Sequence, residues 1–493
     1  MALINLDIPA GVYRNGTDLQ SQGRWRDANL VRWTEGTMRP LGGWRERSET
    51  AADAKIRGML AWDDNSNDRW LVGGTYEKLY VWSINGTRSD ITPAGFTSGR
   101  EDALAFIGYG GNLYGSYAYG VPRPENSRIQ PATSWSLDNW GENLVGCTED
   151  DGKIYEWSLS AGTPAAVVAN APINNTSLVV TSERFLFALG AGGNTRLVQW
   201  SDREDNTTWT PAATNEAGDL ELETSGQIMK GVRVRGQTLI LTTTSAHVAN
   251  YIGPPYVYGI ERVGSSCGLI ASEAVAVVDA GAFWMGAHAF YAYTGGAVQE
   301  IQSDVSDYVF SDINRAQISK SFAVKSSNFG EIFWFYPSGS STENDRYAAY
   351  NYIENTWYTG NLARTAGVDS GVFQYPIWAS ADNNKVYEHE VGFNYGNITP
   401  FAESGPIMLG SGDTVASVVE MIPDEKTQGD VSVTFKTRFY PNGVERDYGP
   451  YAMSDPTSLR FTGRQIRLRV DGVTLGDWRV GINRIDVVPG GRR

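Results

Sequence analysis

The sequence predicts an all-β protein in which a β-propeller of six to eight blades lies between an extended N-terminal arm and a small C-terminal β domain. The 493-residue chain is rich in residues typical of strands and tight turns, with 55 glycines, 25 tyrosines and 16 tryptophans. From about residue 57 onward, short apolar and aromatic runs alternate with Gly, Asn, Asp and Ser. One pattern recurs along the chain: two strands around a polar turn, closed by an aromatic residue.

Residues 1–55 are expected to form the arm and to serve as an assembly interface. They include RWRDANLVRWTEGTMRPLGGWRER at 24–47, which holds three tryptophans and six arginines. Trp and Arg are enriched at the centres of protein interfaces. The alternative is that the tryptophans are core anchors flanked by solvated arginines. The candidate interface residues are Arg24, Trp25, Arg26, Arg32, Trp33, Arg39 and Trp44.

Residues 56–392 are expected to form the propeller-like body. The closing residues of the repeat are Trp82, Tyr119, Trp157, Trp200, Tyr251, Tyr293, Tyr352 and His389, at spacings of 37 to 59 residues. A period of roughly 40 to 50 residues is that of a propeller blade, a four-stranded meander that buries its faces against its neighbours. One or two β-sandwiches are the alternative. The stretch 120–134, GVPRPENSRIQPATS, is expected to be an exposed insertion outside the blades.

Residues 393–493 are expected to form a C-terminal β-sandwich-like domain or extension. VSVTFKTRF at 431–439 and IRLRV at 466–470 alternate apolar with polar residues, as strands with one buried face do. The aromatic blade endings stop before this region.

Composition restricts the function. A formal net charge of −15 argues against a nucleic-acid reader, because affinity for phosphate backbones comes from clustered Lys and Arg. Cys147 and Cys267, the two cysteines, are too few for a disulfide framework and are expected to be reduced and buried. The chain shows no signal-peptide pattern and no long apolar segment, so we expect folding in a cytoplasm without membrane insertion.

The sequence offers no catalytic, cofactor-binding or metal-binding constellation, and we expect no enzyme. TEDDGKIY at 148–155 and SADNNKVY at 380–387 resemble the Asp-box of sialidases, although Asn384 replaces the glycine in the second. That box is a hairpin-turn device and marks fold. The histidines, His247, His288 and His389, lie in three different repeats without zinc-ligand spacing.

Several stretches resemble tail proteins of tailed bacteriophages. They are IPAGVYRNGTDLQSQGRWRDANLVRWTEGTMRPLGGW at the start, GSSCGLIASEAVAVVDAGAFWMGAHAFYAYTGG at 264–296, SDYVFSDINRAQ at 306–317, EIFWFYPSGSSTENDRYAAYNYIENTWYTGNLARTAGVDSG at 331–371 and KVYEHEVGFNYG at 385–396. The resemblance spans roughly the first 400 residues, and the last hundred have no counterpart in it.

The resemblance implies a structural virion protein, a nozzle subunit in the tail of a short-tailed phage, assembled in the bacterial host cytoplasm. Its partners would be copies of itself in a ring of six, the phage adaptor and portal, and tail fibres or spikes. Genomic DNA would pass through the ring without specific binding. Two alternatives stay open: a carbohydrate-binding or glycosidase-like propeller for receptor recognition, and a generic propeller interaction scaffold.

Overall fold

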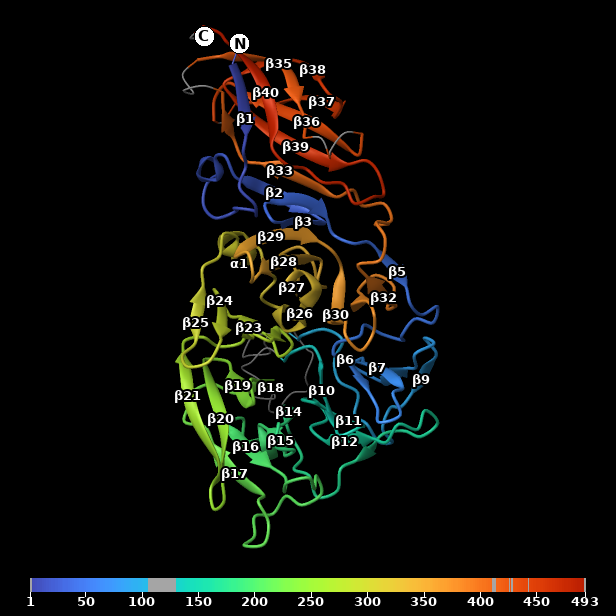
Figure 1. The fold of residues 1–493 in the computed structure, drawn as a ribbon. Coiled ribbons are helices and arrows are strands. Elements are labelled where there is room, and N and C mark those ends of the chain that lie inside the picture. The colour runs from blue at the N-terminus through green and yellow to red at the C-terminus, as the bar shows by residue number, and fades with distance from the viewer. Residues whose placement is uncertain are drawn as a thin grey trace, which may run out of the picture.

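The chain folds into a β-propeller and a β-sandwich, stacked end to end (Figure 1). In the computed structural model, the described residues are 2–104, 130–409, 414–424, 426, 429–441 and 443–491. Both termini lie at the end of the sandwich that points away from the propeller. The all-β propeller prediction is confirmed. No helix in the described part of the chain is long and apolar enough to cross a membrane.

Among the described residues the propeller has seven blades, each a four-stranded antiparallel sheet. The first four blades are β6 (Met59–Asp63), β7 (Arg69–Gly74), β8 (Leu79–Trp82) and β9 (Arg88–Asp90); β10 (Trp135–Trp140), β11 (Asn143–Thr148), β12 (Ile154–Trp157) and β13 (Ala166–Val167); β14 (Ser177–Val180), β15 (Leu186–Leu189), β16 (Leu197–Trp200) and β17 (Gly218–Glu221); and β18 (Ile228–Val234), β19 (Gln237–Thr242), β20 (Ser245–Gly253) and β21 (Val257–Ser265).

The remaining three blades include one that takes a strand from the far end of the chain. They are β22 (Val275–Val278), β23 (Gly281–Met285), β24 (Phe290–Tyr293) and β25 (Gln299–Ile301); β26 (Phe322–Ser326), β27 (Glu331–Tyr336), β28 (Arg346–Asn351) and β29 (Thr356–Asn361); and β30 (Arg364–Val368), β31 (Ile377–Ser380), β32 (Val386–His389) and β5 (Trp44–Glu46). Short helices are α1 (Ser306–Ser311), η1 (Asp18–Ser21), η2 (Ala191–Gly193), η3 (Ile318–Lys320) and η4 (Ser327–Phe329).

The seven repeat markers that the structure describes fall at the same place in a blade, at or near the end of its third strand. Trp157 shows why an aromatic residue is used there: its ring packs 5.3 Å from that of Trp70, on β7 of the preceding blade. Large rings at this position fill the wedge between neighbouring sheets. The markers at or next to the third strands are Trp82, Trp157, Trp200, Tyr251, Tyr293, Tyr352 and His389.

The eighth marker, Tyr119, belongs to a stretch outside the described residues. The repeat expected at 104–119 is described only at Leu104, and the insertion expected at 120–134 only from Gln130 on. Leu104 and Gln130 form an isolated antiparallel bridge, so the two limbs of the β9–β10 connection meet there.

The ring closes through strands from opposite ends of the chain. The innermost strands of neighbouring blades, β6, β10, β14, β18, β22, β26 and β30, contact one another all the way round. In the last blade β5 supplies the outermost strand and pairs with β32, with Trp44 opposite His389. This pairing covers the edge of β32. It also closes the ring, because a strand that precedes the first blade in the sequence completes the last blade.

The sandwich also mixes both ends of the chain, so residues 2–46 are not a free arm. One sheet is β1 (Ala2–Leu6), β40 (Asn483–Pro489), β35 (Ala416–Ile422) and β38 (Thr457–Gly463). The other is β2 (Trp25–Asn29), β33 (Phe401–Ser404), β39 (Gln465–Gly472), β36 (Val431–Arg438) and β37 (Arg446–Ala452), with β34 (Ile407–Met408) also on β39. A hairpin of β3 (Val31–Thr34) and β4 (Thr37–Pro40) lies between the two domains.

The sandwich core follows the alternation in the sequence. Along β36 buried and partly buried residues alternate, and β38 alternates buried with exposed ones. Phe435 and Phe461, from the two sheets, pack with ring centroids 4.9 Å apart. Both cysteines are free and buried.

Candidate functional site

One end of the propeller axis holds a cavity of about 180 Å³. It is lined by the starts of several innermost strands and by the loops that lead into them, including Ser136 on β10, Lys230 on β18 and Ser319 before β26. Because the innermost strands converge on the axis, residues far apart in the sequence face one space. This is where propellers commonly place binding groups.

The cavity is lined by an ion pair between two neighbouring blades. Lys230 is only 9% exposed, and its Nζ lies 2.7 Å from Glu273 Oε1. The same Nζ donates to Ser136 Oγ at 3.4 Å. A buried ammonium needs such a partner to offset its loss of hydration.

Glu149 also lines the cavity, with a side chain that is exposed to solvent, and its pKa is shifted. The surrounding protein and the charge of Asp150 raise the pKa of Glu149 above its ordinary value, and Arg100 acts in the opposite direction. No described side chain forms an ion pair or hydrogen bond with it. Asp150, in contrast, accepts a hydrogen bond from Thr133 and pairs with Arg100. The Asp-box residue Asp150 therefore anchors a loop beside the cavity.

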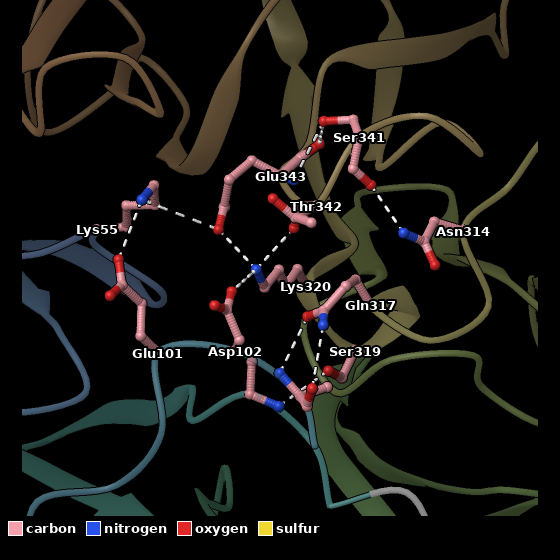
Figure 2. A network of polar contacts seen from close by, with 12 residues as sticks. Lys55, Glu101, Asp102, Asn314, Gln317, Ser319, Lys320, Ser341, Thr342 and Glu343 are labelled. Atoms are coloured by element: carbon pink, nitrogen blue, oxygen red, sulfur yellow. Dashed lines mark hydrogen bonds and ion pairs between the residues drawn. The ribbon is translucent and has the colours of Figure 1, made fainter. Parts of the chain in front are cut away.

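A charge network centred on the buried Lys320 adjoins the cavity (Figure 2). The Lys320 side chain is fully buried, and its Nζ donates to Glu343 Oε1 and to the Thr342 carbonyl, each at 2.6 Å, and to Asp102. Arg57 adds a contact of 2.8 Å to Glu343. These groups come from four separate segments of the chain, and together they tie the first blade to the sixth.

The η3 segment holds both limbs of the β9–β10 connection (Figure 2). The Gln317 side chain accepts from the Ala103 amide and donates to the Ala103 carbonyl, both at 3.0 Å. The Ala132 amide donates to Ser319 Oγ at 3.0 Å. These bonds fix the connection beside the cavity, so the network positions a loop.

The expectation of no metal site stays a prediction. Among the described residues no group of three or more His, Cys, Asp or Glu side chains is placed to hold a metal ion. His389 stacks on Trp378 at 4.1 Å and accepts a hydrogen bond from Arg364. Burial and the Arg364 charge hold the pKa of His389 well below its ordinary value, so it is neutral.

The structure places the seven candidate interface residues in contacts within the chain. Trp25 is 5% exposed, and Trp33 and Arg32 are each 1% exposed. For these three the interface prediction is corrected, because a side chain already covered has no surface left for another copy. Arg24, Arg26, Arg39 and Trp44 are partly exposed, and for them it stays a prediction.

The partly exposed members connect different parts of the molecule. Arg24 Nη2 lies 3.1 Å from Asp304 Oδ2 of the propeller, whereas Arg39 Nη2 lies 3.0 Å from Asp477 Oδ1 of the sandwich. The Trp44 ring packs 5.6 Å from His389. The stretch therefore fastens the two domains together.

Arg32 is the centre of the contact between the hairpin and the propeller. It makes a two-pronged contact with Glu390, with N–O distances of 2.5 and 3.1 Å, and its Nη2 lies 3.0 Å from Glu331 Oε2. Its guanidinium lies over the Phe329 ring at 3.6 Å. Two carboxyls thus share one buried cation.

Because two carboxyls share one cation, the protonation of Glu331 is perturbed. Burial raises the pKa of Glu331 from 4.5 to about 7, although the Arg32 charge and a hydrogen bond from Tyr358 act to lower it. In the folded protein Glu331 holds its proton up to about pH 7, whereas in the unfolded chain it loses the proton near pH 4.5.

We expect this group to make the protein less stable as pH rises from about 4.5 to 7. The folded pKa is raised, so its stabilising contribution is complete below the unfolded pKa and is lost as pH passes the folded one. Glu331→Gln removes the titration and flattens the dependence. Urea unfolding at several pH values measures it, with the exposed Glu300→Gln as control. Equal slopes in wild type and Glu331→Gln would contradict the assignment.

Sequence reasoning missed the cavity residues Lys230 and Glu273, the buried Lys320 and its partner Glu343. A single Lys or Glu in a strand or turn is usually exposed to solvent, so the sequence gives no reason to place it in a cavity. The acidic run TEDD at 148–151 was the one available signal, since Glu149 and Asp150 both line the cavity.

No family model matches the chain, and no curated protein matches it. Among solved structures, virginiamycin B lyase from Staphylococcus aureus is similar over 70% of this chain and 98% of its own, with 7% identity and a TM-score of 0.43. The N-terminal domain of Nup159 is similar over 74% and 98%, with 10% identity and a TM-score of 0.36. For exo-β-1,3-galactanase from Phanerochaete chrysosporium the coverage is 91% and 100%, with 9% identity and a TM-score of 0.33.

Proposed function

We propose that this protein is a structural subunit of a bacteriophage tail, a nozzle component that assembles with its own copies into a ring around the DNA path. None of the three solved structures named above is described as a tail protein. The proposal is supported by the resemblance of roughly the first 400 residues to phage tail proteins. It is also supported by the way the chain fastens its two domains into one unit.

The observation that carries the proposal is the presence of separate exposed apolar surfaces on the two domains. Tyr256, 76% exposed, and Ile252 lie at the tip of the β20–β21 hairpin of the propeller. Val444, 87% exposed, and Tyr440 lie in the β36–β37 loop of the sandwich. A ring needs two different surfaces per subunit, one for each neighbour. Exposed aromatic and aliphatic side chains are what such contacts bury.

Negative-stain microscopy and sedimentation of the purified protein test the assembly. We expect rings from the wild type and smaller species from Tyr256→Ser with Ile252→Ser, or from Tyr440→Ser with Val444→Ser. Ile353→Ser, which also removes an exposed apolar side chain, is the control and should leave the rings intact.

Mixing the two defective variants gives a sharper result. Each retains one good surface, so the pair should form a dimer that neither forms alone if the contact joins the hairpin tip of one copy to the sandwich loop of the next. A wild-type protein that stays monomeric at high concentration and is absent from purified tails would contradict the proposal.

A second candidate is a glycosidase-like or carbohydrate-binding propeller, favoured by Glu149. A general acid in glycoside cleavage is a carboxyl with a raised pKa in a recessed site. Hydrolysis of a panel of chromogenic glycosides, compared between wild type and Glu149→Gln, tests it. Activity that Glu149→Gln abolishes and Glu300→Gln retains would favour this candidate, and absence of hydrolysis across the panel would oppose cleavage.

A further inference from the structure

A second recess, of about 460 Å³, lies between the blade of β18–β21 and the blade of β22–β25. Its walls are the loop before β18, the β19–β20 turn, the segment that follows β21 and the β23–β24 turn. The volume lies within the range of pockets that take small ligands. This recess is distinct from the cavity at the end of the propeller axis, and the two share no lining residue.

The charge of the recess is opposite to that of the protein as a whole. The chain has 56 acidic and 41 basic residues, yet none of the described residues that line the recess is acidic. Arg262 and His288 both line it, and both are exposed. Neither forms an ion pair with a described residue. An unpaired guanidinium is a binding group for an oxyanion. Glu300, the cross-strand partner of Tyr291, does not line the recess, although its charge acts on the Tyr291 hydroxyl.

Hydroxyl groups surround these basic side chains. Ser225, Ser265 and Ser266 line the recess, and their hydroxyls have no hydrogen-bond partner among the described residues. Thr224 Oγ1 lies 2.9 Å from Ser245 Oγ, which in turn lies 3.0 Å from His247 Nε2. Free hydroxyls can donate to an anion and also to the hydroxyls of a sugar.

One wall of the recess is aromatic. The Tyr291 hydroxyl donates to the Ser266 carbonyl at 3.1 Å, and the ring packs 6.0 Å from Trp284. These contacts hold the ring in place. A fixed aromatic side chain offers a flat apolar surface beside polar groups, which suits the apolar face of a sugar ring.

The walls are close-packed and therefore largely formed before any ligand arrives. At Gly268 a Cβ atom would lie 1.9 Å from the Thr243 carbonyl oxygen, so the segment after β21 rests directly on the β19–β20 turn. A site that needs little rearrangement loses less affinity to ordering.

We propose that this recess binds a sugar carrying an oxyanion, with the anionic group at Arg262 and the sugar ring against Tyr291. The shared chemistry is a phosphate or carboxylate on a monosaccharide unit. The binding role goes beyond the assembly role and does not depend on it.

Titration calorimetry of the full-length protein at low salt, with glucose 6-phosphate as the probe, tests the proposal. We expect Arg262→Gln to weaken binding at least about tenfold, as loss of a charge-assisted contact does. Arg315→Gln is the matched control, because Arg315 is also exposed and unpaired among the described residues but does not line the recess. Equal weakening by both variants would mean nonspecific attraction and would overturn the proposal.

Separate titrations with glucose and with inorganic phosphate then test the sugar and the anion individually. Glucose alone and inorganic phosphate alone should each bind more weakly than glucose 6-phosphate, and Tyr291→Leu should reduce the preference for the sugar phosphate over phosphate. Binding of inorganic phosphate as tightly as the sugar phosphate would overturn the role of the sugar. Binding of glucose as tightly would overturn the role of the anion, and no binding of any probe to the wild type would overturn both.

Discussion

Arg32→Met is expected to lower the free energy of unfolding by about 3–5 kcal/mol. The guanidinium is the cation that faces both Glu390 and Glu331, and methionine leaves these carboxyls buried without it. The methionine side chain fills similar space, so the lower unfolding free energy comes mainly from the lost charge and less from lost packing. Chemical unfolding at pH 8, above the wild-type pKa of about 7 for Glu331, measures the loss.

Two further variants separate the charge effect from general damage to the hairpin. Arg39→Met lies on the same hairpin but breaks a partly exposed pair with Asp477, and it should cost less than about 1 kcal/mol. Adding Glu331→Gln and Glu390→Gln to Arg32→Met should recover much of the loss, because no buried charge then remains. Equal losses from Arg32→Met and Arg39→Met would refute the assigned role.

Trp33→Ala is expected to cost about 3–5 kcal/mol of unfolding free energy, as truncation of a fully buried tryptophan does. Trp33 lies between the domains, with its ring 6.1 Å from Trp25 and 6.2 Å from Tyr358 of the propeller. Thermal and chemical unfolding measure the loss. Tyr256→Ala, at a residue that is 76% exposed, is the control and should change stability little.

The same variant distinguishes the two interpretations of the tryptophan-rich stretch. A core residue loses stability on truncation, whereas an interface anchor leaves a folded subunit that no longer assembles. If Trp33→Ala unfolds like the wild type but no longer assembles into a ring of subunits, Trp33 is an interface residue.

The blades could be predicted because each one repeats the same local sequence pattern, two strands around a polar turn with an aromatic residue at the end. Trp157 and Trp200 end strands as expected, and these strands are the third of their blades, where an aromatic ring fills the wedge against the neighbouring blade. The part played by β5 could not be predicted. Its three residues carry no alternating pattern, and their partner strand ends at His389. Long-range pairing of a short strand leaves no trace in local sequence.

The candidate site was predicted less well than the fold. The burial of Arg32 runs against the general preference of arginine for the surface, and only the positions of Glu331 and Glu390 in space reveal it. Lys320 and Asp102 likewise meet only after the ring closes. Asp150 was noticed as part of a turn motif, and its place beside a cavity depends on the packing of blades that no single motif encodes.

The pairing of both chain ends has a consequence for synthesis. The ribosome releases β1, β2 and β5 first, but their partners β40, β33 and β32 emerge hundreds of residues later. Until then β1, β2 and β5 stay without the partner strands they have in the native structure, although β3 and β4 can already pair with each other. Such distant contacts slow folding and keep apolar surface exposed for longer. Completion of this protein therefore waits for its last strands, and a chain cut short near its C-terminus loses the partner of its very first strand.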